Sequence, residues 1–372
     1  MDGRRSIFLY PFSVLYCIIT GIRNFLYDSG ILKSHEFSIP IICVGNIAVG
    51  GTGKTPHAEY LADLLRKDFN VAVLSRGYKR KSSGFRLAGP GSKSGDIGDE
   101  PLQMYRKIAG ITVAVDSNRV RGVKTILKER PGTGVIILDD GFQHRRINPG
   151  YSILLSDFSR PMVKDHLLPY GNLRESIHSK NRADIILITK SPEDISPIQR
   201  RIMVKEIDKR PYQNLYFTSI KYKNPAPVFD DPEPGRDVPG EAGSEDTGIV
   251  LVTGIANPEP LSGYLQKRYG EIIHLTFSDH HQFTLKDIGE ITEAWTSLNS
   301  KKKYVLTTEK DAVRLREFTN IAEPIRSQFF YIPVGISFLN DDREEFDNMI
   351  IDYVRKNKRN NRISQNEGIY KS

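Results

Sequence analysis

Short apolar runs recur along the chain, separated by stretches whose apolar residues follow a helical period. The runs are rich in Val and Ile and continuously apolar, which is typical of strands buried on both faces of a parallel sheet. After the first run, Ala58, Leu61 and Leu65 place one apolar face on a helix. This alternation predicts an α/β fold with a doubly wound parallel sheet. The predicted strands of this first series are 39–44, 71–74, 111–115, 134–138, 152–156 and 184–188.

A second α/β series follows the segment 224–247, whose five prolines and net acidic charge indicate a loop or linker. Its predicted strands are 249–253, 271–277, 303–308 and 329–334. The tail after Arg355 is polar, and we expect it to be disordered. The predicted parts are an N-terminal helical segment (1–35), a core domain (36–212), a linker (213–247), a smaller C-terminal α/β domain (248–340) and a C-terminal helix with a disordered tail (341–372).

The first apolar stretch, residues 6–22, is interrupted by Pro11 and Ser13. It is shorter than the roughly 20 apolar residues that a membrane-spanning helix needs, and no signal-peptide cleavage site follows it. Aromatic residues alternate with aliphatic ones, and basic residues flank the run. These features predict a helix that lies in a membrane interface. The alternative is an N-terminal helix packed on the protein's own core.

The amino-acid composition excludes several classes of protein and favours one kind of binding partner. Hydrophobic residues make up 39% and charged residues 26%, which excludes a wholly disordered, collagen-like or coiled-coil chain. Lys and Arg number 53 against 45 Asp and Glu, and the net charge of +8 favours an anionic partner: nucleic acid, anionic lipid or phosphate. No basic module with interleaved aromatic residues is present, so we expect no nucleic-acid partner. Only Cys17 and Cys43 are cysteines, which fits a reducing, cytoplasmic setting.

The strand at 39–44 leads into a glycine-rich loop and then the helical pattern. The loop matches the phosphate-binding pattern G-x-x-x-x-G-K-[ST] except at its first position, where Ala48 stands. Glycines let backbone N–H groups turn toward phosphate oxygens, Lys54 would reach the β- and γ-phosphates, and Thr55 would ligate Mg²⁺. The alternative is a glycine-rich turn that opens a helix in any Rossmann-type fold. The predicted nucleotide-binding residues are Ala48, Val49, Gly50, Gly51, Thr52, Gly53, Lys54 and Thr55.

Two carboxylates, Asp139 and Asp140, follow the apolar run 134–138. An acid at the carboxyl end of a buried strand fits the residue that holds Mg²⁺ in P-loop proteins. The alternative is a strand-to-loop turn, since Asp is common before Gly. The pattern does not tell which of the two would lie closer to the metal.

Together with VGNIAVGGTGKTP (44–56), the motifs resemble those of the tetraacyldisaccharide 4′-kinase family of lipid A biosynthesis. One of these motifs, LPYGNLRE at 168–175, differs from the LPAGPLRE that is more usual in the family, but it keeps Arg174 and Glu175. The resemblance covers most of residues 8–338. The further motifs are SRGY (75–78), GDEP (98–101), NRVRG (118–122), DDGFQHRR (139–146), LPYGNLRE (168–175), TGIANPEPL (253–261), FSDHHQF (277–283) and TEKDAVRL (308–315).

The resemblance implies a kinase that moves the ATP γ-phosphate to the 4′-hydroxyl of a tetraacylated glucosamine disaccharide 1-phosphate. It further implies two α/β domains joined by a two-stranded hinge, with the nucleotide between them and the return strand near the end of 248–340. ATP and Mg²⁺ are the implied cofactors. The implied partners are the acylated lipid and the cytoplasmic face of the bacterial inner membrane, and we expect a monomer.

The resemblance also assigns roles at the site. Asp99 is the expected base for the 4′-hydroxyl, paired with His280, which would come from the second domain when the two domains close. Glu175 is expected to bind the metal through water or to hold its loop nearby. Because arginine is generally suited to binding phosphate, Arg119, Arg121 and Arg174 are candidates for the substrate's 1-phosphate or the transferring phosphate. Two other functions stay open: a soluble small-molecule kinase or ligase with the same loop, and a P-loop GTPase switch, although the guanine-reading N-K-x-D motif is absent.

Overall fold

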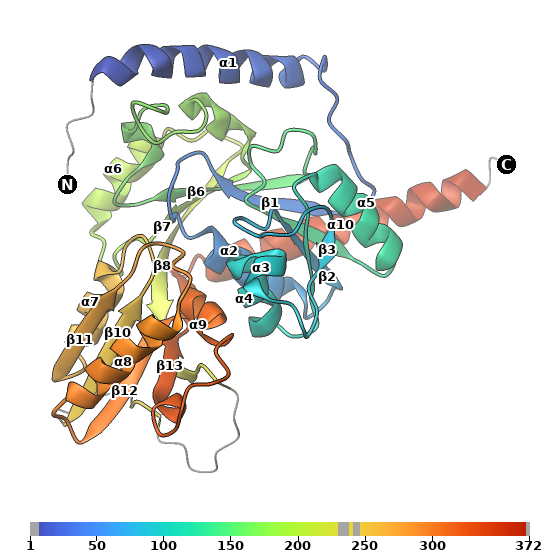
Figure 1. Cartoon of the computed structure of the whole chain (residues 1–372). Helices are drawn as coiled ribbons and strands as arrows, with labels where there is room; N and C mark the ends of the chain where they lie inside the picture. The colour runs from blue at the N-terminus through green and yellow to red at the C-terminus, as the bar shows by residue number, and fades with distance from the viewer. Residues whose placement is uncertain (1–6, 230–237, 241–245, 370–372) are drawn as a thin grey trace. The chain divides into compact units, whose positions relative to one another are not determined.

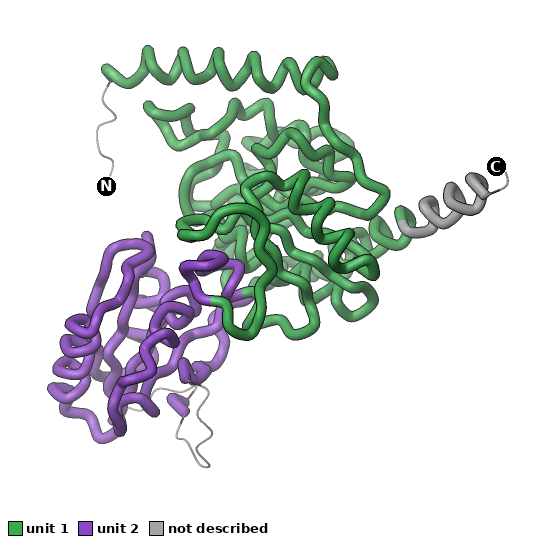
Figure 2. Tube along the Cα trace, turned by 45° about the vertical axis from the view of Figure 1, so that its right-hand side comes forward, with its two compact units in different colours: residues 1–92, 104–220, 336–372 green, residues 93–103, 221–335 purple. Residues whose placement is uncertain are grey.

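The computed structural model describes residues 7–229, 238–240 and 246–369 (Figure 1). The chain forms two compact units (Figure 2). The larger unit comprises 1–92, 104–220 and 336–372, and the smaller unit comprises 93–103 and 221–335. Parts of two predicted segments, 1–6 of the N-terminal segment and 230–237 and 241–245 of the linker, lie outside the described residues.

The sheet of the larger unit has nine strands among the described residues, in the order β14-β8-β7-β6-β1-β5-β2-β4-β3. The central pairs, from β8 through to β4, are parallel, and β3 joins β4 antiparallel. This is the predicted doubly wound parallel sheet. The strands are β1 (Ile41–Asn46), β2 (Val71–Ser75), β3 (Arg86–Leu87), β4 (Thr112–Val115), β5 (Val135–Asp139), β6 (Tyr151–Asp157), β7 (Ile185–Thr189), β8 (Asn214–Tyr222) and β14 (Val334–Phe338).

Two apolar clusters explain why these strands are continuously apolar. In β1, Ile42 and Val44 belong to one buried cluster, and Ile41 and Cys43 belong to the other. Successive side chains of a strand point to opposite faces, so both faces of the sheet are covered. The helices of this unit are α1 (Tyr10–Asp28), α2 (Lys54–Leu65), α4 (Asp99–Lys107, which begins in the smaller unit), α5 (Arg119–Glu129), α6 (Pro197–Ile207) and α10 (Arg343–Ile369). Short 3-10 turns lie at Ile7–Leu9, Met162–Lys164 and Ile177–Arg182.

The helix α1 lies along the surface of the larger unit (Figure 1). Ser13 donates a hydrogen bond to the carbonyl of Leu167, Tyr16 to that of Arg174, and Arg23 to that of Gln143. These anchors span residues 13–23, about 15 Å of helix, so the helix is held lengthwise on the unit. Most of its other side chains are exposed and apolar, among them Phe12, Ile18, Ile22 and Phe25.

By length and composition, Ile7–Asp28 is the one helix of the described chain that could cross a membrane, and only 11% of its apolar window is buried. A spanning helix would leave the protein surface, whereas this one keeps polar anchors along about three turns. Most apolar side chains of α1 face outward, although Tyr10 packs edge-on against Tyr170, with ring centroids 5.5 Å apart.

The smaller unit is a second α/β layer structure. Its five strands among the described residues have the order β11-β10-β12-β13-β9, parallel except for β9. Apolar clusters cover both faces, with Val250 and Val252 on one and Ile249 and Leu251 on the other. Its elements are β9 (Ala226–Pro227), β10 (Thr247–Thr253), β11 (Glu271–Thr276), β12 (Lys302–Thr308), β13 (Phe329–Ile332), α3 (Ser94–Ile97), α7 (Glu259–Gln266), α8 (Leu285–Ser297), α9 (Glu309–Leu315) and a 3-10 turn, Arg326–Gln328.

The division of the chain differs from the predicted one at the segment 93–103. Residues 93–103 group with the smaller unit, because Ser94 donates hydrogen bonds to Glu317 through both its backbone N–H and its hydroxyl. The chain also passes between the units within β8 and within β14, which are neighbours in one sheet.

The C-terminal helix α10 continues to Ile369, beyond the point where the polar composition predicts disorder. Its apolar residues Phe346, Ile350 and Val354 recur every four positions and are buried in one cluster of the larger unit. This stripe anchors the first half of the helix against the sheet.

Candidate active site

The predicted phosphate-binding loop joins β1 to α2 in the larger unit. Gly53, the residue before the helix, has a φ of 84°, a left-handed conformation that glycine adopts without strain. The buried Asn46 side chain organises the loop: its amide donates to Thr52 Oγ1 at 2.8 Å, and its carbonyl accepts from Lys54 Nζ at 3.3 Å. Because Lys54 is the first residue of α2, its ammonium group and the amino end of the helix favour an anion at the same place.

His57 is a residue of this loop region that sequence reasoning missed. Its Nδ1 lies 2.7 Å from the Gly53 carbonyl and its Nε2 lies 2.9 Å from Thr218 Oγ1 on β8. A carbonyl only accepts, so Nδ1 donates and Nε2 accepts from the hydroxyl. Complete burial lowers the pKa of His57 to about 4, with the Gly53 hydrogen bond acting in the opposite direction. A neutral His57 therefore ties the loop to the central sheet.

Asp139 and Asp140 lie at the carboxyl end of β5, next to β1. Val44 pairs with Asp139 in register, which brings the acids beside the loop. Asp139 is buried, and Asp140 has a φ of 50° and faces two cations: its Oδ1 lies 3.6 Å from Lys54 Nζ and its Oδ2 lies 3.6 Å from Arg174 Nη1. Asp140, Lys54 and Arg174 thus converge at the carboxyl end of β5.

The fit of Mg²⁺ to these residues follows from their donor atoms. Asp140 Oδ1 is buried and accepts no hydrogen bond, so it could turn to a cation. Across the described residues, no group of three or more His, Cys, Asp or Glu side chains could hold a metal. Mg²⁺ is usually held by one or two carboxylates together with phosphate oxygens and water, and Asp139 and Asp140 could supply these carboxylates. Thr55, the second residue of α2, lies in the position of the hydroxyl ligand.

Glu175, another expected metal ligand, makes different contacts. It is fully buried, and its Oε2 accepts hydrogen bonds from Arg182 and, at 3.3 Å, from Asn24 of α1. Arg182 also lies over the Phe142 ring, 4.4 Å from its centroid. These contacts link α1 to the loop that carries Arg174.

The arginines expected near a substrate phosphate separate into two environments. Arg119 is buried beside Asp139; burial lowers its pKa, and the charge of Asp139 opposes that shift. Arg121 is half exposed and forms a bidentate ion pair with Asp116, with both N–O distances 2.8 Å. Arg119 therefore accompanies the acids at the end of β5, whereas Arg121 lies on the exposed face of α5.

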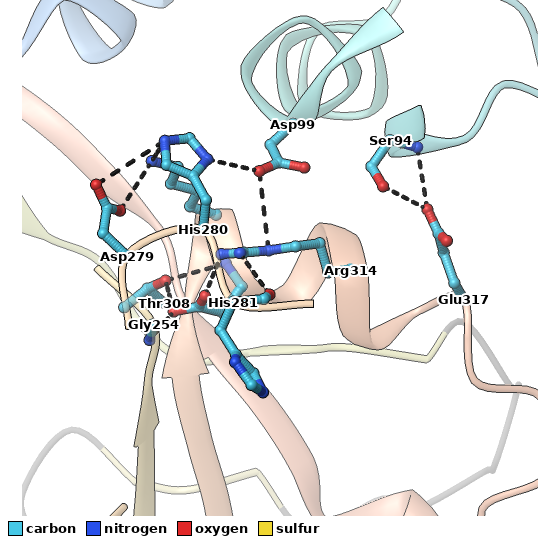
Figure 3. Close-up of polar contacts among 11 residues, drawn as sticks. Ser94, Asp99, Gly254, Asp279, His280, His281, Thr308, Arg314 and Glu317 are labelled. Carbon is cyan, nitrogen blue, oxygen red and sulfur yellow. Dashed lines mark hydrogen bonds and ion pairs between the residues drawn. The ribbon is translucent and has the colours of Figure 1, made fainter. Parts of the chain in front are cut away.

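Asp99 and His280 lie in contact within the smaller unit (Figure 3). His280 Nδ1 is 3.1 Å from Asp99 Oδ2, and about nine-tenths of each side chain is buried. The expectation that the domains must close to pair them is corrected: Asp99 belongs to the segment 93–103, which is part of the same unit as His280.

Lys310, at the start of α9, completes this cluster. Its Nζ lies 3.0 Å from His280 Nε2 and 3.5 Å from Asp279 Oδ1. An ammonium group only donates, so Nε2 accepts and the ring proton resides on Nδ1, directed at Asp99. Lys310 and Asp99 thus contact opposite nitrogens of the His280 ring.

The environment keeps Asp99 ionised. Burial by itself raises the pKa of Asp99, but the hydrogen bond from His280 and the charges of Arg314 and Lys310 outweigh it and lower the pKa below its usual value. Arg314 Nε lies 3.8 Å from Asp99 Oδ2. Among the described residues, no protein group hydrogen-bonds or ion-pairs with the other oxygen, Oδ1, which can therefore accept a proton from outside the cluster.

His281 turns away from Asp99. Its Nε2 lies 2.9 Å from Asp287 Oδ2, and its ring stacks on Phe277 with centroids 4.8 Å apart. Its carbonyl accepts a hydrogen bond from Arg314 at 2.7 Å. Of the two adjacent histidines, the structure thus places only His280 against Asp99.

Lys310 and Arg314 belong to the TEKDAVRL motif, which contributes to the family resemblance but to which the sequence analysis assigned no site residue. The order of the strands could have drawn attention to this segment. Residues after β10, β11 and β12 meet at one edge of the sheet, because these strands are adjacent and parallel. Asp279 and His280 follow β11, and Lys310 follows β12.

These features define an α/β nucleotide-binding protein with the lysine, hydroxyl and carboxylate set of P-loop phosphotransferases. Comparison with known proteins gives the family. The family model for tetraacyldisaccharide-1-P 4′-kinase matches residues 5–355. The chain therefore belongs to this family of kinases, and the resemblance predicted from the motifs is confirmed.

Individual relatives agree with this assignment. The chain is 45% identical to a tetraacyldisaccharide 4′-kinase of Bacteroides thetaiotaomicron over 371 residues, which cover 98% of this chain and 97% of the relative. It is 47% identical to the Phocaeicola vulgatus kinase of the same name over 358 residues, 96% and 97% of the two chains. A crystal structure of the "apo" form of LpxK from Aquifex aeolicus in complex with ATP has a TM-score of 0.71 at 28% identity, covering 93% of this chain and 98% of that one.

Proposed function

We propose that this chain transfers the γ-phosphate of ATP to the 4′-hydroxyl of a tetraacylated glucosamine disaccharide 1-phosphate. The observation that carries the proposal is the convergence of Lys54 and Asp140 at the glycine-rich loop of a chain matched by the kinase family over residues 5–355. The relative whose crystal structure contains ATP supports the choice of nucleotide.

The larger unit holds the nucleotide. Backbone N–H groups of residues 48–55 surround the phosphates, and Lys54 contacts the β- and γ-phosphates. Asn46 holds the Lys54 ammonium group in place before the nucleotide binds. Thr55 with Asp139 or Asp140 would hold Mg²⁺, which would neutralise the charge that develops on the transferring phosphate. Glu175 acts on the same site through its loop, because Arg182 and Asn24 occupy its Oε2.

The smaller unit supplies the base. Asp99 Oδ1 accepts the proton of the 4′-hydroxyl, while the Nδ1–H of His280 holds Oδ2 in place. A loose phosphoryl-transfer transition state needs little deprotonation of the attacking oxygen, so an ionised carboxylate with a lowered pKa is a sufficient acceptor. Lys310 acts through His280 and is therefore a positioning residue.

We further propose that the enzyme works as a monomer at the cytoplasmic face of the bacterial inner membrane. The exposed apolar residues of α1 support a contact with the membrane. The acyl chains of the substrate remain in the bilayer, so the enzyme must reach a headgroup at the interface. The exposed residues Phe12, Ile18, Ile22 and Phe25 provide the apolar surface that such an arrangement requires.

The test is phosphate transfer by the full-length protein in detergent micelles, with the acylated disaccharide 1-phosphate as acceptor. The expected product carries one added phosphate at C4′, identified by mass spectrometry and ³¹P NMR. Phosphorylation of soluble sugars or nucleosides instead, with the acylated disaccharide unchanged, would favour a soluble small-molecule kinase and contradict the proposal.

A further inference from the structure

A basic groove of about 750 Å³ lies between the C-terminal part of α1 and helix α5, inside the larger unit. The residues that line it include six Lys and Arg side chains and no Asp or Glu. A second hollow of about 360 Å³ adjoins it and shares Arg23, Tyr27 and Arg146. The six cations are Arg23, Lys33, Arg121, Lys124, Lys128 and Arg146.

Among the described residues, four of the six cations form neither an ion pair nor a side-chain hydrogen bond. Arg121 is paired with Asp116, and Arg23 donates to the carbonyl of Gln143. By contrast, Lys33, Lys124, Lys128 and Arg146 form no ion pair with any described residue. Like charges gathered around one hollow repel one another, so the groove is favourable for an anion that approaches all four.

The cations come from three separate parts of the chain that the fold fixes together. Lys124 and Lys128 are one turn apart on α5. Lys33 lies in the segment between α1 and β1, which is docked by backbone hydrogen bonds from His35 N–H to the Arg146 carbonyl (2.8 Å) and from the Asn148 N–H to His35 (3.0 Å). A solvent-exposed face of a single helix would present only the cations of that helix, without those of the other two segments.

The same groove has an apolar margin. Tyr27 and Leu32 line it, and the neighbouring Phe25 and Ile31 expose about two-thirds of their surface. Phosphate groups favour the cations, and acyl chains favour the apolar residues of α1. The shape of the combined surface therefore matches an amphiphile with a phosphate headgroup rather than a soluble anion.

We propose that this groove binds the phosphate of an anionic membrane lipid, whose acyl chains extend along the exposed apolar face of α1. The expected source is an anionic phospholipid of the bilayer; the 1-phosphate of the acylated substrate has the same chemistry. The inference rests on the proposed placement of α1 at the membrane, and its test uses binding rather than phosphate transfer, so that it can fail independently of the kinase activity.

The experiment measures flotation of the full-length protein with vesicles of neutral phosphatidylcholine, alone or with phosphatidylglycerol. The variant is Lys124→Gln with Lys128→Gln. Lys67→Gln with Lys356→Gln is the control, since it removes two exposed charges from the same unit outside the groove. Each lysine near an anionic surface contributes about 1 kcal/mol, so the gain in binding caused by phosphatidylglycerol should fall about tenfold or more in the variant but not in the control.

A second arm distinguishes the source of the phosphate. Vesicles of phosphatidylcholine carry the acylated disaccharide 1-phosphate in place of phosphatidylglycerol. Loss of binding with phosphatidylglycerol vesicles assigns the groove to bilayer phospholipid, and loss confined to the disaccharide vesicles assigns it to the substrate. Equal losses in the variant and the control, or no loss with either lipid, would overturn the lipid-phosphate site.

Discussion

His280 Nδ1 lies 3.1 Å from Asp99 Oδ2, although 181 positions separate the two residues in the chain. Both belong to the smaller unit, because the segment 93–103 departs from the core domain in which its sequence position would place it. The pair is thus assembled within one unit, and its formation requires no closure between units. Phosphate binding and proton acceptance are assigned to different units of the enzyme.

The first prediction concerns the coupling of this pair. Asp99→Ala and His280→Ala should each lower turnover by about 10²- to 10⁴-fold, the range of general acid–base catalysis. If His280 acts through Asp99, the double variant should be little worse than the worse single one. Rates of ATP-dependent phosphorylation for the four proteins measure this, with ATP affinity as the control. Multiplicative losses would show that the residues act independently.

The second prediction concerns Lys310. Lys310→Met removes the donor that fixes the ring of His280, so the Nδ1–H form should give way to a mixture of tautomers and turnover should fall about tenfold or more. ¹⁵N NMR of the imidazole reports the tautomer, and Lys310→Arg, which keeps a donor, should restore part of the activity. An unchanged ¹⁵N spectrum in the Met variant would refute the positioning role.

The third prediction concerns pH and His57. The folded-state pKa of about 4 lies below the ordinary value of 6.5, so the unfolded chain binds the proton first as pH falls. The contribution of His57 to the free energy of unfolding is fully present above pH 6.5. It falls by roughly 3 kcal/mol in total as the pH drops from 6.5 to 4. Urea unfolding at several pH values, compared with His57→Gln, measures it. The variant should show a shallower fall in unfolding free energy over that window; parallel curves would contradict the assignment.

The fourth prediction concerns α1. Ile18→Ser with Ile22→Ser removes exposed apolar side chains but leaves the anchors at Ser13, Tyr16 and Arg23 intact. Burial of each side chain in a bilayer interface is worth about 1.5–3 kcal/mol, so the protein should shift from the membrane fraction to the soluble one. Leu285→Ser, at an exposed apolar residue of the smaller unit, is the control. If the α1 variant sediments with membranes as the wild type does, the membrane contact lies elsewhere.

The apolar runs predicted the buried strands well, because a strand covered on both faces must be apolar throughout, as in β1 and β5. The edge strand β14 and most of β8 are only partly buried, with mixed sequences that give a weak signal. The placement of 93–103 depends on the contact between Ser94 and Glu317, 223 positions away, which no local pattern records.

In the candidate site, too, some features could be predicted from the sequence and others could not. Lys54 and Asp140 follow buried strands that pair in register, so their proximity was predictable from the order of elements. The role of His57 depends on burial and on Thr218, neither of which is visible in the sequence pattern. The contact of Glu175 with Arg182 could not be predicted either, because the two side chains meet only once the loop has folded.

The central claim is that the Lys54 loop delivers the γ-phosphate to the 4′-hydroxyl of an acylated disaccharide 1-phosphate. The direct measurement is transfer of ³²P from γ-labelled ATP in micelles, by wild type and by Lys54→Ala, to the disaccharide and to its 4′-deoxy analogue. The account predicts labelling of the disaccharide only, and a loss of about 10²- to 10³-fold in the folded variant, since one preorganised charge contact is worth about 3–4 kcal/mol in the transition state. Labelling of the 4′-deoxy analogue, or near wild-type transfer by folded Lys54→Ala, would contradict it.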